Sequence, residues 1–260
     1  MALDWKIFTR RPYIASLSLE EQTRLFYIAN EKSIRYRSRS GTGPAGLSFT
    51  NTRSLNFDGT DDFITVNNFN SLASVNTFTV SFWANFNSVV TNDTLINHYS
   101  TLGIRAFLQG SKMRFLWQSQ DGTNVIVTST NNVTTGTWKH YACTYDNTDF
   151  KLFENGSLIA TTNEPSKTYK SNLNFDLIIG KYFHGVQRLF DGLMDEVAIF
   201  DNVQNIATLY NDGIPNDLSS LSPLHWYRFE EGSGTTATDS GTEGNNGTIT
   251  GATYSTDVPS

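Results

Sequence analysis

The chain has 260 residues, a net charge of −6 and one cysteine, and 13% of its residues are aromatic. The mild charge argues against nucleic acid as the main partner, and a single cysteine excludes an intramolecular disulfide framework. Residues 1–30 lack the apolar run of a signal peptide, and no stretch of about 18 apolar residues is present, so we expect neither export nor membrane insertion.

The charge is distributed unevenly along the chain. Residues 1–40 carry eight basic and four acidic side chains, a net of +4, while the remainder carries eleven basic and twenty-one acidic ones, a net of −10. We interpret residues 1–46 as a basic attachment arm on an acidic body, with an ordinary solvated terminus as the alternative. The residues expected to attach the arm to a partner are Trp5, Arg10, Arg11, Tyr13, Arg35, Arg37 and Arg39.

One helix is predicted inside the arm, at about residues 19–32. Ser18 and Glu21 fit a capping box, because the Ser18 hydroxyl can cap the first turn while Glu21 reaches back to the Ser18 amide. Apolar residues then repeat at helical spacing at Leu25, Ile28 and Ala29. The Gly- and Pro-containing segment 41–46 marks the first domain boundary.

From residue 47 to residue 200 the pattern is that of short strands joined by turns. Residues 78–86 alternate between a hydrophobic face and a face that contains Trp83. Asp121-Gly122 and Asn155-Gly156 predict two-residue hairpin turns, in which both central positions need a positive φ. Further strands are predicted at residues 102–108, 113–118, 124–130, 138–145, 149–154, 157–161, 173–179 and 193–200. Short strands about ten residues apart predict an all-β, two-sheet antiparallel sandwich.

A short helix is predicted after the last core strand, over residues 202–211. Asp201 or Asn202 would cap it, and Gly213 would end it. A connector follows, and residues 214–260 are too few for a second sandwich.

Six short motifs and a helix occur in the order in which a known family has them. They are Leu55–Phe63, Phe78–Trp83, Trp138–Asp146, Leu152–Gly156, Ile178–Gly180, Asp191–Phe200 and the helix Ile206–Tyr210. This order resembles the laminin-G-like (type 3) jelly rolls of the concanavalin-A-like lectin/glucanase superfamily. The resemblance implies a jelly roll over residues 47–213, a fold that is usually a binding surface and only sometimes an enzyme.

One segment departs from the family order. Residues 226–252 resemble a segment that normally precedes the first motif, but here they follow the last one. Three arrangements of residues 214–260 stay open: the segment supplies edge strands of its own sandwich, as a circular permutation would, it pairs with a neighbouring subunit, or it is an independent docking tail.

The combination of basic arm, jelly roll, connector and displaced segment also resembles virion proteins of tailed bacteriophages, particularly marine ones. This resemblance implies a non-enzymatic surface component of the virion (capsid decoration, head fibre or tail component) that assembles in the host cytoplasm. The implied partners are a major capsid or tail protein, reached through the arm, and further copies of the chain in a homo-oligomer. A carbohydrate-binding lectin module unrelated to a virion is the alternative, and a glycoside hydrolase is less favoured.

The family resemblance implies two kinds of site. Family members often bind a structural calcium ion near the first and last motifs, which here places the ligands at Asp58 and Asp195, with Asp61, Asp62 or Asp191 as further candidates. Turn formation by Asp58-Gly59 and Asp191-Gly192 is the alternative.

Carbohydrate binding is the family's commonest task, and it uses exposed aromatic side chains together with polar groups. The candidates are Tyr99, Tyr182, His184 and Arg188, with Trp83 and Trp117 expected to be packed instead.

The sequence favours a non-enzymatic protein. The glycosidases of the superfamily need a Glu-x-Asp-x-x-Glu strand, which is absent. Asp195 and Glu196 are adjacent, so on a regular strand they face opposite sides and cannot act as a pair. A Ser-His-Asp triad stays open, but no Gly-x-Ser-x-Gly motif points to one.

Overall fold

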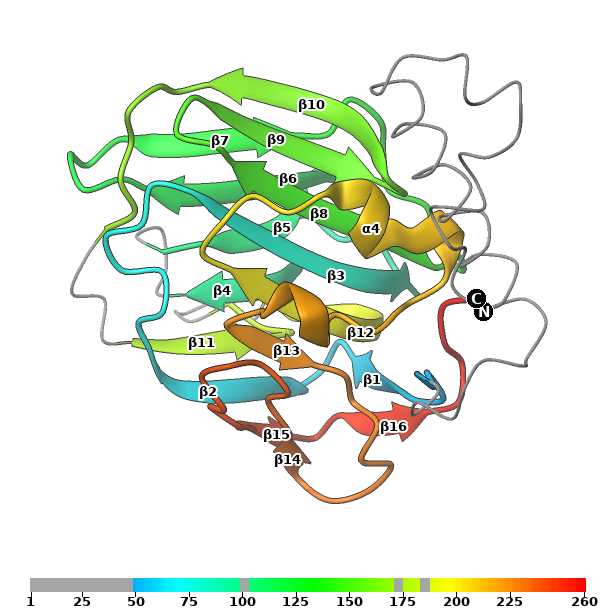
Figure 1. Cartoon of the computed structure of the whole chain (residues 1–260). Helices are drawn as coiled ribbons and strands as arrows, with labels where there is room; N and C mark the ends of the chain where they lie inside the picture. The colour runs from blue at the N-terminus through cyan, green and yellow to red at the C-terminus, as the bar shows by residue number, and fades with distance from the viewer. Residues whose placement is uncertain (1–48, 99–102, 171–174, 183–187) are drawn as a thin grey trace, which may run out of the picture. The chain divides into compact units, whose positions relative to one another are not determined.

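The computed structural model describes residues 49–98, 103–170, 175–182 and 188–260. The unit Thr50–Ser260 contains two antiparallel sheets of eight strands each, packed as a sandwich (Figure 1). This confirms the all-β architecture expected from the sequence. The predicted helix at 19–32 and the seven attachment residues of the arm lie outside the described residues. In the part of the chain that is described, no helix is long and apolar enough to cross a bilayer.

The first sheet, sheet A, has the strand order β10-β9-β8-β3-β12-β1-β16, and β13 pairs with a further stretch of β12. Its strands are β1 (Ser54–Asp58), β3 (Phe78–Phe86), β8 (Lys139–Tyr145), β9 (Asp149–Glu154), β10 (Ser157–Asn163), β12 (Asp191–Phe200), β13 (His225–Tyr227) and β16 (Thr253–Ser255).

The second sheet, sheet B, has the strand order β14-β15-β2-β11-β4-β5-β6-β7. Its strands are β2 (Phe63–Phe69), β4 (Thr94–His98), β5 (Arg105–Gln109), β6 (Lys112–Gln118), β7 (Asn124–Thr128), β11 (Phe175–Ile179), β14 (Thr236–Ala237) and β15 (Gly247–Thr250).

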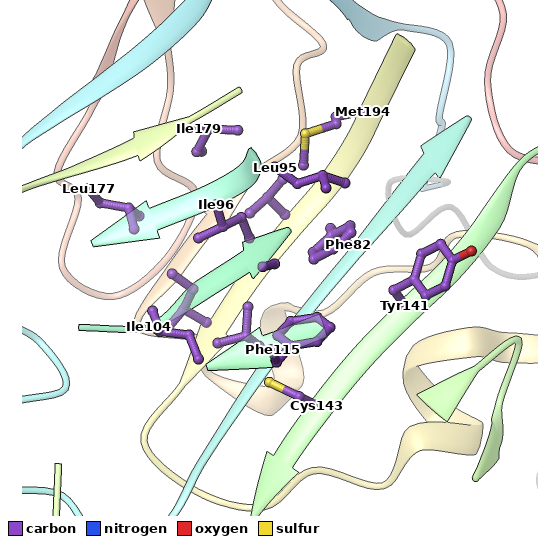
Figure 2. Close-up of a cluster of buried hydrophobic side chains, with 14 of the residues drawn as sticks. Phe82, Leu95, Ile96, Ile104, Phe115, Tyr141, Cys143, Leu177, Ile179 and Met194 are labelled. Atoms are coloured by element: carbon purple, nitrogen blue, oxygen red, sulfur yellow. The ribbon is translucent and has the colours of Figure 1, made fainter. Parts of the chain in front are cut away.

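Side chains from both sheets fill the space between them. Strand β3 sends alternate residues into this core, as predicted: Phe78, Val80, Phe82, Ala84 and Phe86. Figure 2 shows Phe82 and Met194 of sheet A in one cluster with Ile96 and Phe115 of sheet B. The rings of Phe82 and Phe115 stack with centroids 5.9 Å apart. Burying each such ring stabilises the fold by about 2–3 kcal/mol, so this aromatic interface holds the two sheets together.

The other face of β3 is also covered, because the helix α4 (Ile206–Tyr210) packs on it. The Tyr210 ring stacks on Trp83 with centroids 5.8 Å apart. The predicted start of this helix was wrong: Asn205 caps it, accepting a hydrogen bond from the Ala207 amide at 3.0 Å. Residues 202–204 instead bind β3, where the Thr79 hydroxyl donates to Asn202 O and accepts from Gln204 N. Two short 3-10 helices follow, η1 (Asn211–Gly213) and η2 (Ser219–Leu221).

Residues 225–255 add strands to both sheets of the same sandwich. Strand β13 pairs with β12 and β16 pairs with β1 in sheet A, while β15 pairs with β2 in sheet B. Tyr227 and Phe229 of this segment are fully buried in the common core. The displaced segment therefore covers the edges that β1 and β2 would otherwise present, and its own strands β16 and β14 become the terminal strands of the two sheets.

The two predicted hairpin turns differ in outcome. Asn155 and Gly156 have φ values of 48° and 76°, as a two-residue turn between β9 and β10 requires. The turn at Asp121-Gly122 was predicted wrongly, because only Gly122 has a positive φ and five residues separate β6 from β7. There Asp121 Oδ1 accepts from the Thr123 amide at 2.9 Å, which closes a turn through the side chain.

Candidate functional site

The turn between β1 and β2 gathers carboxylates that were expected to bind calcium. Oxygen atoms of Asp58, Asp61 and Asp62 lie within 4.8 Å of one another. Asp191 is the cross-strand partner of Asp58. A Cβ atom on Gly59 would come 2.9 Å from the Asp191 Cβ atom, and Gly59 has a φ of +73°, so a glycine is needed where the turn passes Asp191.

The oxygen donors of this turn fit a calcium ion. Asp62 Oδ2 accepts from the Asp58 amide and Asp58 Oδ1 accepts from the Thr60 amide, both at 2.8 Å. These bonds fix the turn while other carboxylate oxygens stay available. Calcium takes six to eight oxygen ligands in flexible geometry, and an exposed turn supplies carboxylates, carbonyls and water.

Asp195 lies away from this turn. It is four residues along β12 from Asp191, about 13 Å at the usual strand rise. It is fully buried and accepts hydrogen bonds from Asn51 Nδ2 at 2.8 Å and from the Glu196 amide at 2.9 Å. The structure thus brings Asp58, Asp61, Asp62 and Asp191 together and places Asp195 elsewhere.

The strand alternation expected for Asp195 and Glu196 does not hold, because β12 contains a bulge. The register with β3 shifts between Asp195 and Ala198, and Glu196 has a φ of 50°. Glu196 Oε2 accepts from Trp226 Nε1 at 2.5 Å and Glu196 Oε1 accepts from Arg228 Nε at 3.4 Å.

Burial raises the pKa of Asp195 well above its usual value and that of Glu196 to about 8, and the negative charge of Glu196 raises the pKa of Asp195 further. All four carboxylate oxygens of the pair accept hydrogen bonds from the protein, so the pair anchors residue 51 and β13.

Two of the predicted carbohydrate-binding residues come together on the outer face of sheet B. The guanidinium carbon of Arg188 lies 5.0 Å from the centre of the Tyr182 ring, and that of Arg105 lies 4.3 Å from the same centre. Arg105 also lies 3.9 Å from the centre of the Phe107 ring and donates from Nη2 to Thr94 Oγ1 at 2.9 Å. We call Thr94, Asn97, Arg105, Phe107, Tyr182 and Arg188 the Arg105 cluster.

The strand register explains why these side chains share one face. Asn97 is the cross-strand partner of Arg105, and Thr94 is the partner of Phe107. Directly opposed residues point to the same side of a sheet. Their neighbours Ile96 and Ala106 point into the core, so the cluster lies on the outer face.

The other carbohydrate candidates are distributed differently. Tyr99 and His184 lie outside the described residues. Trp117 is fully buried in the core, and Trp83 is 4% exposed beneath α4. Both side chains are therefore packed, as expected from the sequence. Sequence reasoning missed Arg105 and Phe107, although their i, i+2 spacing on a predicted strand placed a cation and a ring on one face.

The structure also forms a serine–histidine–aspartate relay that the sequence left open. Ser71 Oγ lies 2.6 Å from His225 Nε2, and His225 Nδ1 lies 2.7 Å from Asp239 Oδ2. His225 is fully buried, with its ring centroid 5.0 Å from that of Phe69. Asp239 accepts three more bonds, from the amides of residues 226, 241 and 245. This pattern ties the displaced segment to the loop after β2.

Two packed antiparallel sheets with this order of strands define a concanavalin-A-type jelly roll. Residues 58–209 match the laminin G type 3 family of the concanavalin A-like lectin/glucanases superfamily, and the chain belongs to that family. None of the curated proteins matches the chain.

Solved structures share the fold. A "putative carbohydrate binding protein" from Bacteroides ovatus is similar with a TM-score of 0.64 and 21% identity, covering 81% of this chain and 62% of its own length. The chain thus spans less than two thirds of that protein, and at this identity the likeness shows the fold alone.

Two further structures are similar at lower TM-scores. A SAP-like pentraxin from Limulus polyphemus has a TM-score of 0.48 and 12% identity, covering 62% of this chain and 81% of its own. The sialyllactose-bound CBM40 of the Ruminococcus gnavus IT-sialidase has a TM-score of 0.44 and 17% identity, covering 53% and 83%.

Proposed function

We propose that the chain is a non-catalytic carbohydrate-binding module that holds a glycan at the Arg105 cluster. The observation that carries this proposal is the partly exposed Tyr182 ring with the guanidinium groups of Arg105 and Arg188 over it. An aromatic ring can stack on a sugar, while guanidinium groups donate hydrogen bonds to its oxygens. The fold shared with a "putative carbohydrate binding protein" supports the same class of ligand.

Two sets of residues could in principle be catalytic: the Asp195–Glu196 pair and the Ser71–His225–Asp239 relay. The contacts of both sets favour a binding function over a catalytic one. The oxygens of Asp195 and Glu196 are all engaged in structural hydrogen bonds, so neither carboxylate is free to protonate a leaving group. The Ser71–His225–Asp239 relay has a fully buried histidine and joins the displaced segment to the loop after β2, which fits a structural role.

A glycan array probed with the full chain tests the proposal. We expect binding to a subset of glycans, with Tyr182→Ala weakening the affinity at least tenfold and Tyr182→Phe retaining most of it, because the ring is what stacks. Tyr210→Ala is the matched control, since Tyr210 is a partly exposed tyrosine of α4, which packs on sheet A away from the Arg105 cluster. No bound glycan, or equal loss in Tyr210→Ala, would contradict the proposal.

Display of this module on a virion is the second proposal, and it rests on the charge distribution of the sequence. A basic arm of net +4 joined to a body of net −10 suits attachment to an acidic capsid or tail protein, in a homo-oligomer on the particle. Arginine forks pair well with carboxylates, although each exposed pair contributes only about 0–1 kcal/mol, so Trp5 and Tyr13 would have to add apolar contact.

Deletion of residues 1–46 tests the attachment separately from sugar binding. We expect the truncated protein to lose incorporation into particles and to keep its glycan affinity. Particles decorated by the truncated protein would show that the arm is not the attachment segment.

A structural calcium ion at the β1–β2 turn is the third proposal. Asp58, Asp61 and Asp62 would hold it, with Asp191 close by, and the two positive charges of the ion would offset part of the negative charge of these carboxylates. Its role would be to stabilise the turn, since the Arg105 cluster lies on other strands.

A further inference from the structure

Arg105 is a buried cation without an acidic partner. It is 5% exposed, and its hydrogen bond to Thr94 is the one it makes among the described residues. Its Nε is buried with no hydrogen-bond partner, and no described carboxylate forms an ion pair with it. Buried charges in proteins are normally paired, because removing an isolated charge from water is costly.

A second cation increases the excess of positive charge. The guanidinium groups of Arg105 and Arg188 both lie over the Tyr182 ring. Burial, with a smaller contribution from the positive charge of Arg188, lowers the pKa of Arg105 to about 10. Two like charges at one ring repel each other, and a bound anion would relieve this repulsion.

The side-chain amide of Asn97 adds hydrogen-bond donors and an acceptor opposite Arg105. Asn97 is fully buried, and both its Nδ2 and Oδ1 lack a partner among the described residues. It lies directly opposite Arg105 on the outer face of the sheet. Buried polar groups are hydrogen-bonded in most proteins, so three such atoms on two opposed residues point to a ligand.

Taken together, these groups indicate the charge of the ligand. We propose that the Arg105 cluster selects anionic glycans, binding the carboxylate or sulfate ester of an acidic sugar between Arg105 and Arg188 while the sugar ring lies against Tyr182. The guanidinium fork matches the oxygens of either anion and forms paired, charge-assisted hydrogen bonds with them. The inference deepens the carbohydrate-binding function and rests on it.

Calorimetry with the full chain tests this selectivity against four probes. They are an oligogalacturonate, a sulfated chondroitin oligosaccharide, a neutral galactan oligosaccharide and inorganic sulfate. We expect at least tenfold tighter binding of one of the two anionic oligosaccharides than of the neutral one, and which of them binds identifies the carboxylate or the sulfate as the ligand group.

Variants connect the selectivity to the cluster. Arg188→Gln and Arg105→Gln should each reduce the anionic affinity at least tenfold, and Arg105→Lys should recover little, because an ammonium lacks the fork. Lys170→Gln is the control of equal charge change, since the Lys170 ammonium donates to Gln118 Oε1 and not to an acid. Arg188 is partly exposed, so its variant keeps the test valid if Arg105→Gln fails to fold.

The outcomes separate this inference from the function on which it rests. Equal binding of the neutral oligosaccharide with unchanged affinity in Arg188→Gln would overturn the anionic selectivity and leave carbohydrate binding intact. Binding of inorganic sulfate through Arg105 without binding of any sugar would overturn the glycan assignment. Equal losses in Lys170→Gln would overturn the role of the cluster.

Discussion

His140 and Arg105 are both buried titratable residues, but burial affects them differently. Burial lowers the pKa of His140 to about 3, so the ring is neutral at pH 7, with Nε2 bonded to Ser81 Oγ at 2.8 Å. Burial lowers the pKa of Arg105 only to about 10, so Arg105 stays charged at pH 7, where a bound anion would stabilise it. A buried side chain that is neutral, such as His140, fits a structural role. A buried side chain that stays charged, such as Arg105, fits a binding site.

The histidine predicts how stability changes with pH. The folded state of His140 has a pKa near 3 and the unfolded state about 6.5, so its contribution is present above pH 6.5 and is lost as pH falls toward 3. Between pH 7.5 and 4.5 the wild type should lose about 2.6 kcal/mol more free energy of unfolding than His140→Gln does. Urea unfolding at both pH values measures this difference. The same loss in both proteins would show that His140 is not the group that titrates.

At the residue scale the sequence predicted part of the candidate site. Tyr182 and Arg188 were found because an aromatic and a cation in one loop are typical of sugar binding. Arg105 and Asn97 were not, because their significance comes from being opposed across β4 and β5 and from lacking partners, which only the folded structure shows. Strand β4 itself was not predicted, so this register could not be anticipated.

At the element scale, β12 joins three features of the molecule. Its first residue, Asp191, lies beside the acidic β1–β2 turn, its bulge carries Asp195 and Glu196, and its last part pairs with β13. In a regular strand the side chains of Asp195 and Glu196 would point to opposite faces of the sheet. The bulge in β12 breaks this alternation. A contact between residues far apart in sequence also explains why α4 starts later than predicted. Thr79 of β3 forms hydrogen bonds with residues 202 and 204, which lie outside the helix.

The β1–β2 turn predicts a calcium response. Adding calcium to the full chain at about 100 times its Kd should stabilise the fold by about 2.7 kcal/mol and raise the Tm, and a chelator should reverse the rise. Asp61→Asn should reduce the response, because Asp61 is exposed and belongs to the turn. Asp195→Asn is the control that should keep it. A melting curve that does not change between calcium and chelator would rule out the site.

At the scale of the whole molecule, the displaced segment and the core strands form one sandwich. Residues 225–255 pair with strands of both sheets, and Ser71–His225–Asp239 ties them to the loop after β2. The order of the family motifs was enough to predict the jelly roll. It did not choose among the arrangements of the last segment, because two of the strands with which that segment pairs, β1 and β2, lie more than a hundred residues earlier in the chain.

The most direct test of where the ligand binds is amide hydrogen exchange. It is measured on the full chain with and without a glycan that the glycan array has identified. The account predicts slower exchange in peptides that contain Tyr182, Arg188 and the start of β5, and no change in peptides from α4 or β9 on sheet A. Protection confined to α4 and sheet A, with none around Tyr182, would contradict it.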